Sequence, residues 1–219
     1  MYRYIFFDLD GTLTDSKEGI MNCVRYALEK LNEPVPDESV LLSFIGPPLH
    51  ESFINCCGFD EDKAHYAVEL FRERYTPIGK FENAPAPGMA ALCERLKERG
   101  FTLALASSKP EEMCRAICER FGFASHLETI VGSAPGKDWK KADIIRETMR
   151  RLSLTETDVP DILMVGDRKY DVLGAAECGI DCVGVEFFGY AEPGELTEAG
   201  AVAVVDSAEE LEEFLLPHL

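Results

Sequence analysis

Short apolar runs alternate with amphipathic segments along most of the chain. Six runs are continuous in apolar character, which is typical of parallel strands buried on both faces. The expected strands are Tyr4–Phe7, Thr102–Ala106, Thr129–Val131, Ile162–Val165, Cys182–Val185 and Val202–Val205. Helical segments lie between them, such as Met89–Arg99 and a helix that opens at Pro110 and ends before Gly122. This alternation predicts an α/β fold with a doubly wound, mostly parallel sheet.

The alternation stops between the first two expected strands. Residues 15–83 contain no convincing strand, and Asp15 with Glu18 resembles a capping box at a helix start. The expected helices there are Ser16–Leu31, Asp37–Phe44, Pro48–Cys57 and Asp60–Thr76. About seventy residues are too many for a simple crossover between strands. We therefore expect residues 15–83 to form an inserted helical cap, and residues 1–14 and 84–219 to form the α/β core.

The charge balance narrows the classes of partner. The chain of 219 residues carries 40 acidic and 22 basic side chains, a formal net charge of −18. This charge argues against nucleic acid and against an anionic membrane surface as partners. The chain has no apolar run of transmembrane length and no signal-like leader, so we expect a cytoplasmic protein. Its eight cysteines are scattered without a CxxC pair, which favours reduced thiols.

The strongest chemical signal follows the first expected strand. Asp8 and Asp10 are separated by one residue, so in an extended chain both side chains point to the same side. Gly11 then allows a tight turn, and Thr12 follows it. An acidic turn at a strand end is the simpler interpretation, because Asp-Gly is common in turns. The whole string from Phe6 to Thr14 is far more specific than that dipeptide.

A second acidic cluster follows the strand Ile162–Val165. Asp167 comes directly after Gly166, and Asp171 lies four residues further on. Ligands of an open parallel sheet bind beyond the carboxyl ends of its strands, where Asp167 and Asp171 would meet Asp8 and Asp10. Two like charges 4 Å apart repel by about 4 kcal/mol at an effective dielectric constant of 20. Such a cluster needs a cation or must hold protons, and for a cation the oxygen-only ligands favour Mg²⁺. The alternative for Asp171 is a helix N-cap.

Two further segments carry groups that suit a phosphate. Ser107 and Ser108 end one strand and open a helix, where hydroxyls and amides favour an anion, although the pair alone suggests only capping. In the helix after Trp139, Lys141 falls in the apolar stripe while Lys140 lies about 100° away. We therefore expect Lys141 to face inward and Lys140 to face solvent. With the tight turn, the expected phosphate-binding residues are Gly11, Thr12, Ser107, Ser108 and Lys141.

These acidic, serine and lysine motifs, in this order along the chain, resemble the motifs of the haloacid dehalogenase-like hydrolase superfamily. Asp8 to Thr12 matches its first motif, Ser107 its second, Lys141 its third, and Gly166-Asp167 with Asp171 its fourth. The resemblance covers nearly the whole chain, including a helical cap after the first strand. Within the superfamily the chain looks closest to the phosphoglycolate phosphatase-like branch, which includes nucleotidases and pyrophosphatases.

The resemblance implies a role for each residue. Asp8 would be the nucleophile that forms an aspartyl-phosphate, and Asp10 would protonate the leaving oxygen and later activate water. Mg²⁺ would be held by Asp8, the backbone carbonyl of Asp10, Asp167 and waters, with Asp171 supporting the metal or orienting Lys141. Dehalogenase members of the superfamily lack an acid at the position of Asp10, so its presence indicates phosphoryl transfer.

The cap offers a candidate specificity loop. Gly46, Pro47 and Pro48 form a stiff turn between two expected helices, and a comparable loop in this branch faces the leaving group of the substrate. A plain helix connector is an equal alternative. Cys114 and Cys118, one helical turn apart, are expected to pack in the core rather than bind metal.

These observations predict an Mg²⁺-dependent phosphatase. Its expected substrate is a small phosphorylated metabolite, such as a phosphoglycolate-like ester, a nucleotide or a sugar phosphate. The alternatives are a phosphotransferase or mutase, or a pyrophosphatase, using the same phospho-aspartate. A non-enzymatic binding module is disfavoured by the intact acidic and basic set. We expect a monomer, with a dimer as the alternative, because no apolar association stripe is apparent.

Overall fold

The computed structural model describes residues 2–134, 137 and 139–215 and forms two compact units. A core unit comprises Met1–Thr14 and Pro85–Leu219, and a helical unit comprises Asp15–Ala84. The two passages of the chain between the units pair as a two-stranded sheet of β2 (Thr14–Asp15) and β3 (Ala84–Pro85). Within the described ranges, no helix combines the length and apolar character needed to cross a bilayer.

The core unit is built on a six-stranded sheet with the strand order β5-β4-β1-β6-β7-β8. Its strands are β1 (Tyr4–Phe7), β4 (Thr102–Pro110), β5 (Thr129–Ser133), β6 (Ile162–Gly166), β7 (Asp181–Val185) and β8 (Ala203–Val205). Every neighbouring pair is parallel, which confirms the predicted doubly wound α/β sheet. Phe7 of the central β1 lies opposite Leu105 and Val165, so the carboxyl ends of three strands meet at one edge.

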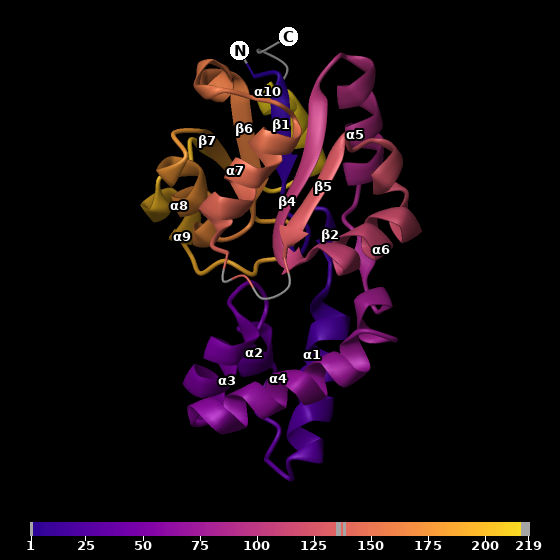
Figure 1. The fold of residues 1–219 in the computed structure, drawn as a ribbon, viewed down its shortest axis with the longest axis vertical. Helices are drawn as coiled ribbons and strands as arrows, with labels where there is room; N and C mark the ends of the chain where they lie inside the picture. The colour runs from indigo at the N-terminus through magenta and orange to yellow at the C-terminus, as the bar shows by residue number, and fades with distance from the viewer. Residues whose placement is uncertain (1, 135–136, 138, 216–219) are drawn as a thin grey trace. The chain divides into compact units, whose positions relative to one another are not determined.

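Helices cover both faces of the sheet (Figure 1). One face packs against α5 (Met89–Glu98), α6 (Glu111–Phe121) and α10 (Ala208–Leu215). The other face packs against α7 (Lys141–Arg151), α8 (Lys169–Glu177) and α9 (Glu195–Ala199). Short 3₁₀ turns occupy Phe123–Ser125 and Glu156–Asp161. Ile5 and Phe7 enter the first core and Phe6 the second, and all three are fully buried, so β1 is apolar throughout.

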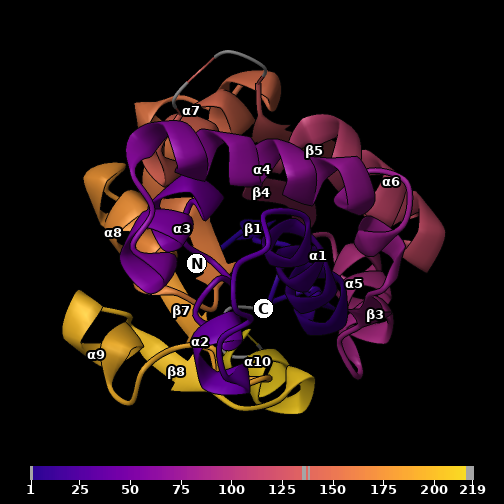
Figure 2. The ribbon, with the colours of Figure 1, turned by 90° about the horizontal axis from the view of Figure 1, so that it is seen from below.

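The helical unit contains four α-helices within its described residues. They are α1 (Lys17–Lys30), α2 (Glu38–Leu42), α3 (Leu49–Cys57) and α4 (Glu61–Tyr75), followed by a 3₁₀ turn at Gly79–Phe81. Figure 2 shows α3 alongside α4, a pair whose residues are in contact. Phe44 and Phe53 meet edge to face, with ring centroids 5.1 Å apart, and both are buried. Aromatic packing therefore supplies much of the core of this unit.

Two local predictions were wrong. Asp15 does not form a capping box with Glu18, because its Oδ1 accepts a hydrogen bond from the Lys17 N–H at 3.0 Å, and the cap residue is Ser16. Pro110 does not open a helix, because it is the last residue of β4, and α6 begins one residue later. The fixed backbone of proline suits both the end of a strand and the residue before a helix, so sequence alone could not separate them.

Candidate active site

The loop after β1 places two carboxylates at the edge of the sheet. The Asp8 N–H donates to the carbonyl of Val165 at 2.9 Å, which continues the pairing of β1 with β6 for one residue. The chain then turns back, and the N–H groups of Leu13 and Thr14 both donate to the carbonyl of Leu9 at 2.9 Å. Gly11 lies in this turn with φ near 80°, a conformation that favours glycine. Asp8 and Asp10 therefore lie in the loop that follows β1, beyond the part of the sheet that the helices cover.

The connection from β6 to α8 carries the second pair of carboxylates. Asp167 and Asp171 are 4% and 1% exposed, and both belong to the described core unit. Asp171 is not the N-cap of α8, which is Arg168, but it lies in the first turn and its Oδ2 accepts the Arg168 N–H at 3.2 Å. A methyl group on Gly166 would lie 2.3 Å from Cγ of Asp171. The glycine therefore leaves room for the carboxylate to approach the strand.

Three of the four predicted metal ligands come together. Asp8, Asp167 and Asp171 each offer an oxygen, and these oxygens lie within 4.8 Å of one another. Oδ2 of Asp167 is buried and accepts no hydrogen bond, which is costly for a carboxylate unless a cation is bound. The carboxylate of Asp10 is not part of this group. An oxygen-only set of this kind fits Mg²⁺.

The crowding of acids changes their titration. Burial, together with the neighbouring carboxylates of Asp171 and Asp8, raises the pKa of Asp167 well above its usual value. Burial also raises the pKa of Asp171 to about 6, although Lys141 acts in the opposite direction. For both acids burial is the largest cause of the shift, because it disfavours the ionised form, and the neighbouring carboxylates add to it.

Lys141 is the cation buried among these acids. Its Nζ lies 3.0 Å from Oδ1 of Asp8 and 2.6 Å from Oδ1 of Asp171, and it donates to the carbonyl of Ala106 at 3.1 Å. Burial favours the neutral amine, but the two carboxylates outweigh burial and raise the pKa of Lys141 above its usual value. Lys140 is exposed. The first residue of α7 is therefore the one that reaches the sheet edge.

The remaining predicted phosphate-binding residues do not all come together. Ser107 is 2% exposed at the end of β4, and its Oγ accepts the Lys109 N–H at 3.4 Å. Thr12 is fully buried, and its hydroxyl has no hydrogen-bond partner in the structure. Ser108 is exposed, in the stretch of β4 where its pairing with β5 shifts in register. Ser107 and Thr12 are therefore buried near this edge, whereas Ser108 faces solvent.

Lys109 is a residue that the sequence analysis did not assign. Its Nζ forms an ion pair with Oδ2 of Asp10, and its side chain is 8% exposed. The pair joins the loop after β1 to the end of β4. A lysine two residues after Ser107 is a weak signal in a sequence, since it also suits the solvated end of a strand. Only the pairing of β1 with β4 brings this amine to Asp10.

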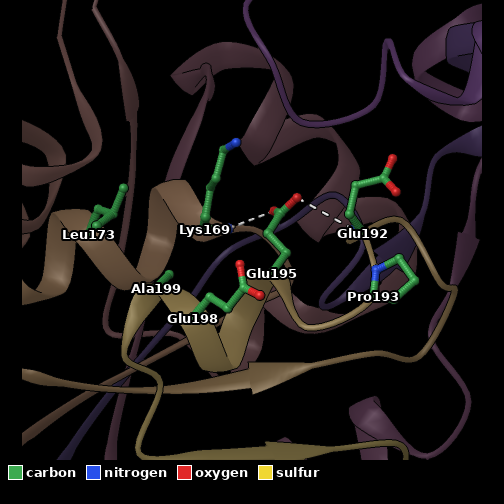
Figure 3. A pocket seen from close by; sticks show the side chains of 7 residues that line it. All are labelled: Lys169, Leu173, Glu192, Pro193, Glu195, Glu198 and Ala199. Carbon is green, nitrogen blue, oxygen red and sulfur yellow. Dashed lines mark hydrogen bonds between the residues drawn. The ribbon is translucent and has the colours of Figure 1, made fainter.

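Glu195 is a second residue that the sequence analysis missed. It is 9% exposed at the start of α9, and its Oε1 accepts both Nε of Arg168 and the Lys169 N–H at 2.9 Å. Figure 3 shows the bond to Lys169 in a shallow pocket beside α8, where Glu195 also accepts the Glu192 N–H. The carboxylate thereby fastens α9 to the segment between Asp167 and α8.

The candidate specificity loop lies in the helical unit, and the two cysteines considered as metal ligands lie in the core unit. Gly46, Pro47 and Pro48 lie between α2 and α3, and Gly46 has φ near 102°. Cys114 and Cys118 lie on α6 and are fully buried in the core, as the packing interpretation predicted. All eight cysteines are free thiols. Burial raises the pKa of Cys118 to about 12, so it is a poor nucleophile.

Comparison with known proteins gives a family match over most of the chain. The sequence model described as "Haloacid dehalogenase-like hydrolase" matches residues 5–185. A protein of Pseudomonas aeruginosa named 5'-nucleotidase is 42% identical over 196 residues, which cover 89% of this chain and 87% of that protein. The motif-based resemblance is therefore confirmed.

Two further relatives extend the comparison. The structure of a predicted phosphatase from Clostridium acetobutylicum is 42% identical, covers 99% of both chains and superposes with a TM-score of 0.91. A Mycobacterium tuberculosis protein named tyrosine-protein kinase PtkA is 36% identical over 216 residues, which cover 97% of this chain and 72% of that protein. The names of these three relatives refer to more than one kind of phosphoryl chemistry.

Proposed function

Because this chain belongs to the haloacid dehalogenase-like hydrolase family and is a phosphoric monoester hydrolase, we propose that it acts through an aspartyl-phosphate with the help of Mg²⁺. The observation that carries the proposal is the pairing of Lys141 with Asp8 and Asp171 beside the buried carboxylate of Asp167. This arrangement supplies a nucleophile, a fixed cation and an oxygen-only metal site at one edge of the sheet.

In the proposed first step, a carboxylate oxygen of Asp8 attacks phosphorus, and the bond to the leaving oxygen breaks. Asp10 donates a proton to that oxygen, so the leaving group departs as a neutral alcohol. Water then attacks the phosphorus of the aspartyl-phosphate, Asp10 takes a proton from it, and phosphate leaves while the Asp8 carboxylate is restored. Two carboxylates on one loop thus act as nucleophile and as acid and base.

The neighbouring groups position these two acids. Lys141 neutralises part of the charge on Asp8 and would bind a phosphoryl oxygen, with Ser107 and Thr12 offering hydroxyls to the others. Lys109 holds the carboxylate of Asp10 by its ion pair. Asp8, Asp167 and Asp171 would hold Mg²⁺, with the Asp10 carbonyl as a further ligand. Bound Mg²⁺ would offset the repulsion between carboxylates and phosphate and stabilise the charge of the transition state.

We propose nucleoside 5'-monophosphates as the first substrate class to test. Support comes from the name of the Pseudomonas aeruginosa relative, which is 42% identical. Phosphoglycolate, sugar phosphates and pyrophosphate belong in the same panel, because the proposed site handles the phosphoryl group and does not define the leaving group. Residues 15–83 would form the cap that reads the leaving group, with Gly46, Pro47 and Pro48 as the candidate loop.

The test is Mg²⁺-dependent release of phosphate across this panel and an aryl phosphate. We expect activity in the wild type, loss with a chelator, and at least about a thousandfold loss in Asp8→Asn, because the amide is a poor nucleophile. Asp206→Asn is a matched control, because Asp206 also follows a strand of the sheet but lies exposed beyond the edge strand β8. Activity that survives in Asp8→Asn would overturn the nucleophile assignment.

A second candidate is transfer of the phosphoryl group to a hydroxyl acceptor. The Mycobacterium tuberculosis relative is named a tyrosine-protein kinase, and this name is the reason to test phosphoryl transfer as well as hydrolysis. The phospho-aspartate is common to both reactions, and they differ in whether water or an alcohol attacks it. Incubation with a phosphate donor and a tyrosine-containing peptide distinguishes them: phosphopeptide formation favours transfer, whereas release of inorganic phosphate alone favours hydrolysis.

A further inference from the structure

A group of metal-binding side chains lies in the helical unit, apart from the four acids discussed above. His50 is the second residue of α3, and Glu61 and His65 lie on α4. Glu61 and His65 are four residues apart, so they project from the same side of their helix. Figure 2 shows α3 alongside α4, and the packing of these two helices brings the side chain of His50 close to Glu61 and His65.

The three side chains are close enough to share one ion. One ligand atom from each residue lies within 4.8 Å of the other two. Nε2 of His50 is 3.0 Å from Oε2 of Glu61, and the imidazole rings of His50 and His65 have centroids 4.1 Å apart. Ligand atoms around a tetrahedral Zn²⁺ are about 3.3 Å apart, given metal–ligand bonds of about 2.0–2.1 Å. Small side-chain rotations therefore suffice to complete this geometry.

His50 and Glu61 approach each other closely enough to share a proton or a metal ion. Nε2 of His50 is shielded from solvent and forms no hydrogen bond, although a carboxylate oxygen lies at 3.0 Å. An imidazole lone pair and a carboxylate at this distance repel each other unless a proton or a metal ion lies between them. Lys63 does not compensate, since its Nζ contacts Oε1 of Glu33 and lies over the ring of Phe59.

We propose that His50, Glu61 and His65 form a site for a divalent transition metal ion that joins α3 to α4. The donor set is two imidazoles and one carboxylate, which suits Zn²⁺, Ni²⁺ or Cu²⁺ and is a poor match for Mg²⁺. With three protein ligands, water completes the coordination. The site differs in chemistry from the oxygen-only group of Asp8, Asp167 and Asp171, so the two would select different metals. It does not depend on the proposed function.

Zn²⁺ binding to the untagged full-length protein tests this proposal. Titration calorimetry is done with the cysteines of the protein kept reduced. Excess Mg²⁺ is present so that the proposed carboxylate site is occupied and does not take up Zn²⁺. We expect micromolar or tighter binding to the wild type and at least about a hundredfold weaker binding to His65→Gln, because one of three ligands is lost. Zn²⁺ should also raise the melting temperature of the wild type but not of His65→Gln.

His126→Gln is the matched control, because His126 belongs to the core unit and is outside this group. It should bind Zn²⁺ as the wild type does. Co²⁺ provides a second measurement, since a four-coordinate site absorbs visible light, and this absorption should disappear in His50→Gln. Equal binding by the wild type and His65→Gln would overturn the proposal. So would a cobalt–thiolate band, which would assign the metal to cysteines, or an absence of binding, which would leave only a proton between His50 and Glu61.

Discussion

At the level of single residues, the space around Gly11 couples the turn after β1 to the acids after β6. A methyl group at this position would lie 2.0 Å from Oδ2 of Asp167, closer than any real contact. The glycine also has φ near 80°. Two separate requirements therefore meet at one residue, a left-handed backbone and room for a neighbouring carboxylate.

We predict that Gly11→Ala lowers kcat/KM by about a hundredfold or more. The new methyl group must displace Asp167, and misplacement of a catalytic group by about 1 Å is enough for a loss of that size. The left-handed backbone should also cost about 1–2 kcal/mol of stability. Phosphate release at saturating Mg²⁺ and urea denaturation measure the two effects.

Gly122→Ala is the control that distinguishes the steric effect of the new methyl group from the strain of a left-handed backbone. Gly122 has nearly the same φ, 82°, but a methyl group there meets nothing within 4 Å. It should lose a similar amount of stability and keep its activity. Equal activity losses in the two variants would show that strain alone, and not contact with Asp167, explains the effect.

At the level of elements, α9 holds the start of α8 in position. Glu195 accepts hydrogen bonds from Arg168 and from the Lys169 N–H, and both residues follow Asp167 directly. Burial raises the pKa of Glu195, but these hydrogen bonds outweigh burial and leave the pKa lowered. The ion pair with Arg168 is largely shielded, with side chains 12% and 6% exposed. The short helix α9 thus fixes the segment that joins Asp167 to the first turn of α8, where Asp171 lies.

We predict that Glu195→Ala lowers the free energy of unfolding by about 3 kcal/mol, because it leaves Arg168 shielded without its carboxylate. It should also weaken Mg²⁺ activation by loosening the segment between Asp167 and Asp171. Since the pKa of Glu195 is lowered, this stabilisation is present at neutral pH and disappears as pH falls below about 4. Urea denaturation of the wild type and Glu195→Ala, at neutral pH and again below about pH 4, measures this difference in stability.

Glu198→Ala is the control for Glu195→Ala. Glu198 lies on the same short helix and lines the same pocket, but it is exposed (Figure 3). Its substitution changes net charge and helix propensity in the same way, yet should alter stability by less than about 0.5 kcal/mol. A similar loss in both variants would contradict the assigned role of the buried ion pair.

At the level of the whole molecule, a strongly acidic chain also brings several of its carboxylates together at a buried point. The net charge is −18, and the carboxylates of Asp8, Asp167 and Asp171 meet where parallel strands end. Because the pKa values of Asp167 and Asp171 are raised by burial, the folded protein holds protons that the unfolded chain has released. The contribution of these acids to stability is therefore fully present below about pH 4, and the part due to Asp171 is lost as pH rises through about 6.

We predict that Mg²⁺ reverses this decline. At pH 7.5, above the pKa of Asp171 of about 6, fewer protons compete with the ion, so Mg²⁺ at about 100 times its dissociation constant should add about 2.7 kcal/mol, or roughly 5–10 °C in melting temperature. At pH 5 protons compete for the same oxygens, and the increase should be smaller. Thermal melts with and without Mg²⁺ at the two pH values test this.

Asp167→Asn is the control for the magnesium effect. It removes one carboxylate charge without a large change in side-chain volume, so its melting temperature should respond little to Mg²⁺ at either pH. An equal increase at pH 5 and pH 7.5 in the wild type would contradict the coupling between protonation and metal binding.

Much of the architecture followed from local patterns. Continuous apolar runs such as Tyr4–Phe7 can be strands only if both faces are covered, and this predicted the α/β sheet. The spacing of Asp8 and Asp10, and the position of Lys141 in an apolar stripe, depend only on local backbone periodicity. Interactions within a few residues of the chain determine such features. The same locality explains the errors at Asp15 and Pro110, where two local arrangements are compatible with one sequence.

The tertiary structure decided which groups touch. Lys109 reaches Asp10 because β4 pairs with β1, and Glu195 reaches Arg168 because α9 packs beside α8, although 99 and 27 residues separate the partners. Pairing between distant segments depends on packing across the whole sheet, which no short pattern encodes. The sequence therefore specified the chemical groups and their strands, whereas the folded chain selected the partners that hold them in place.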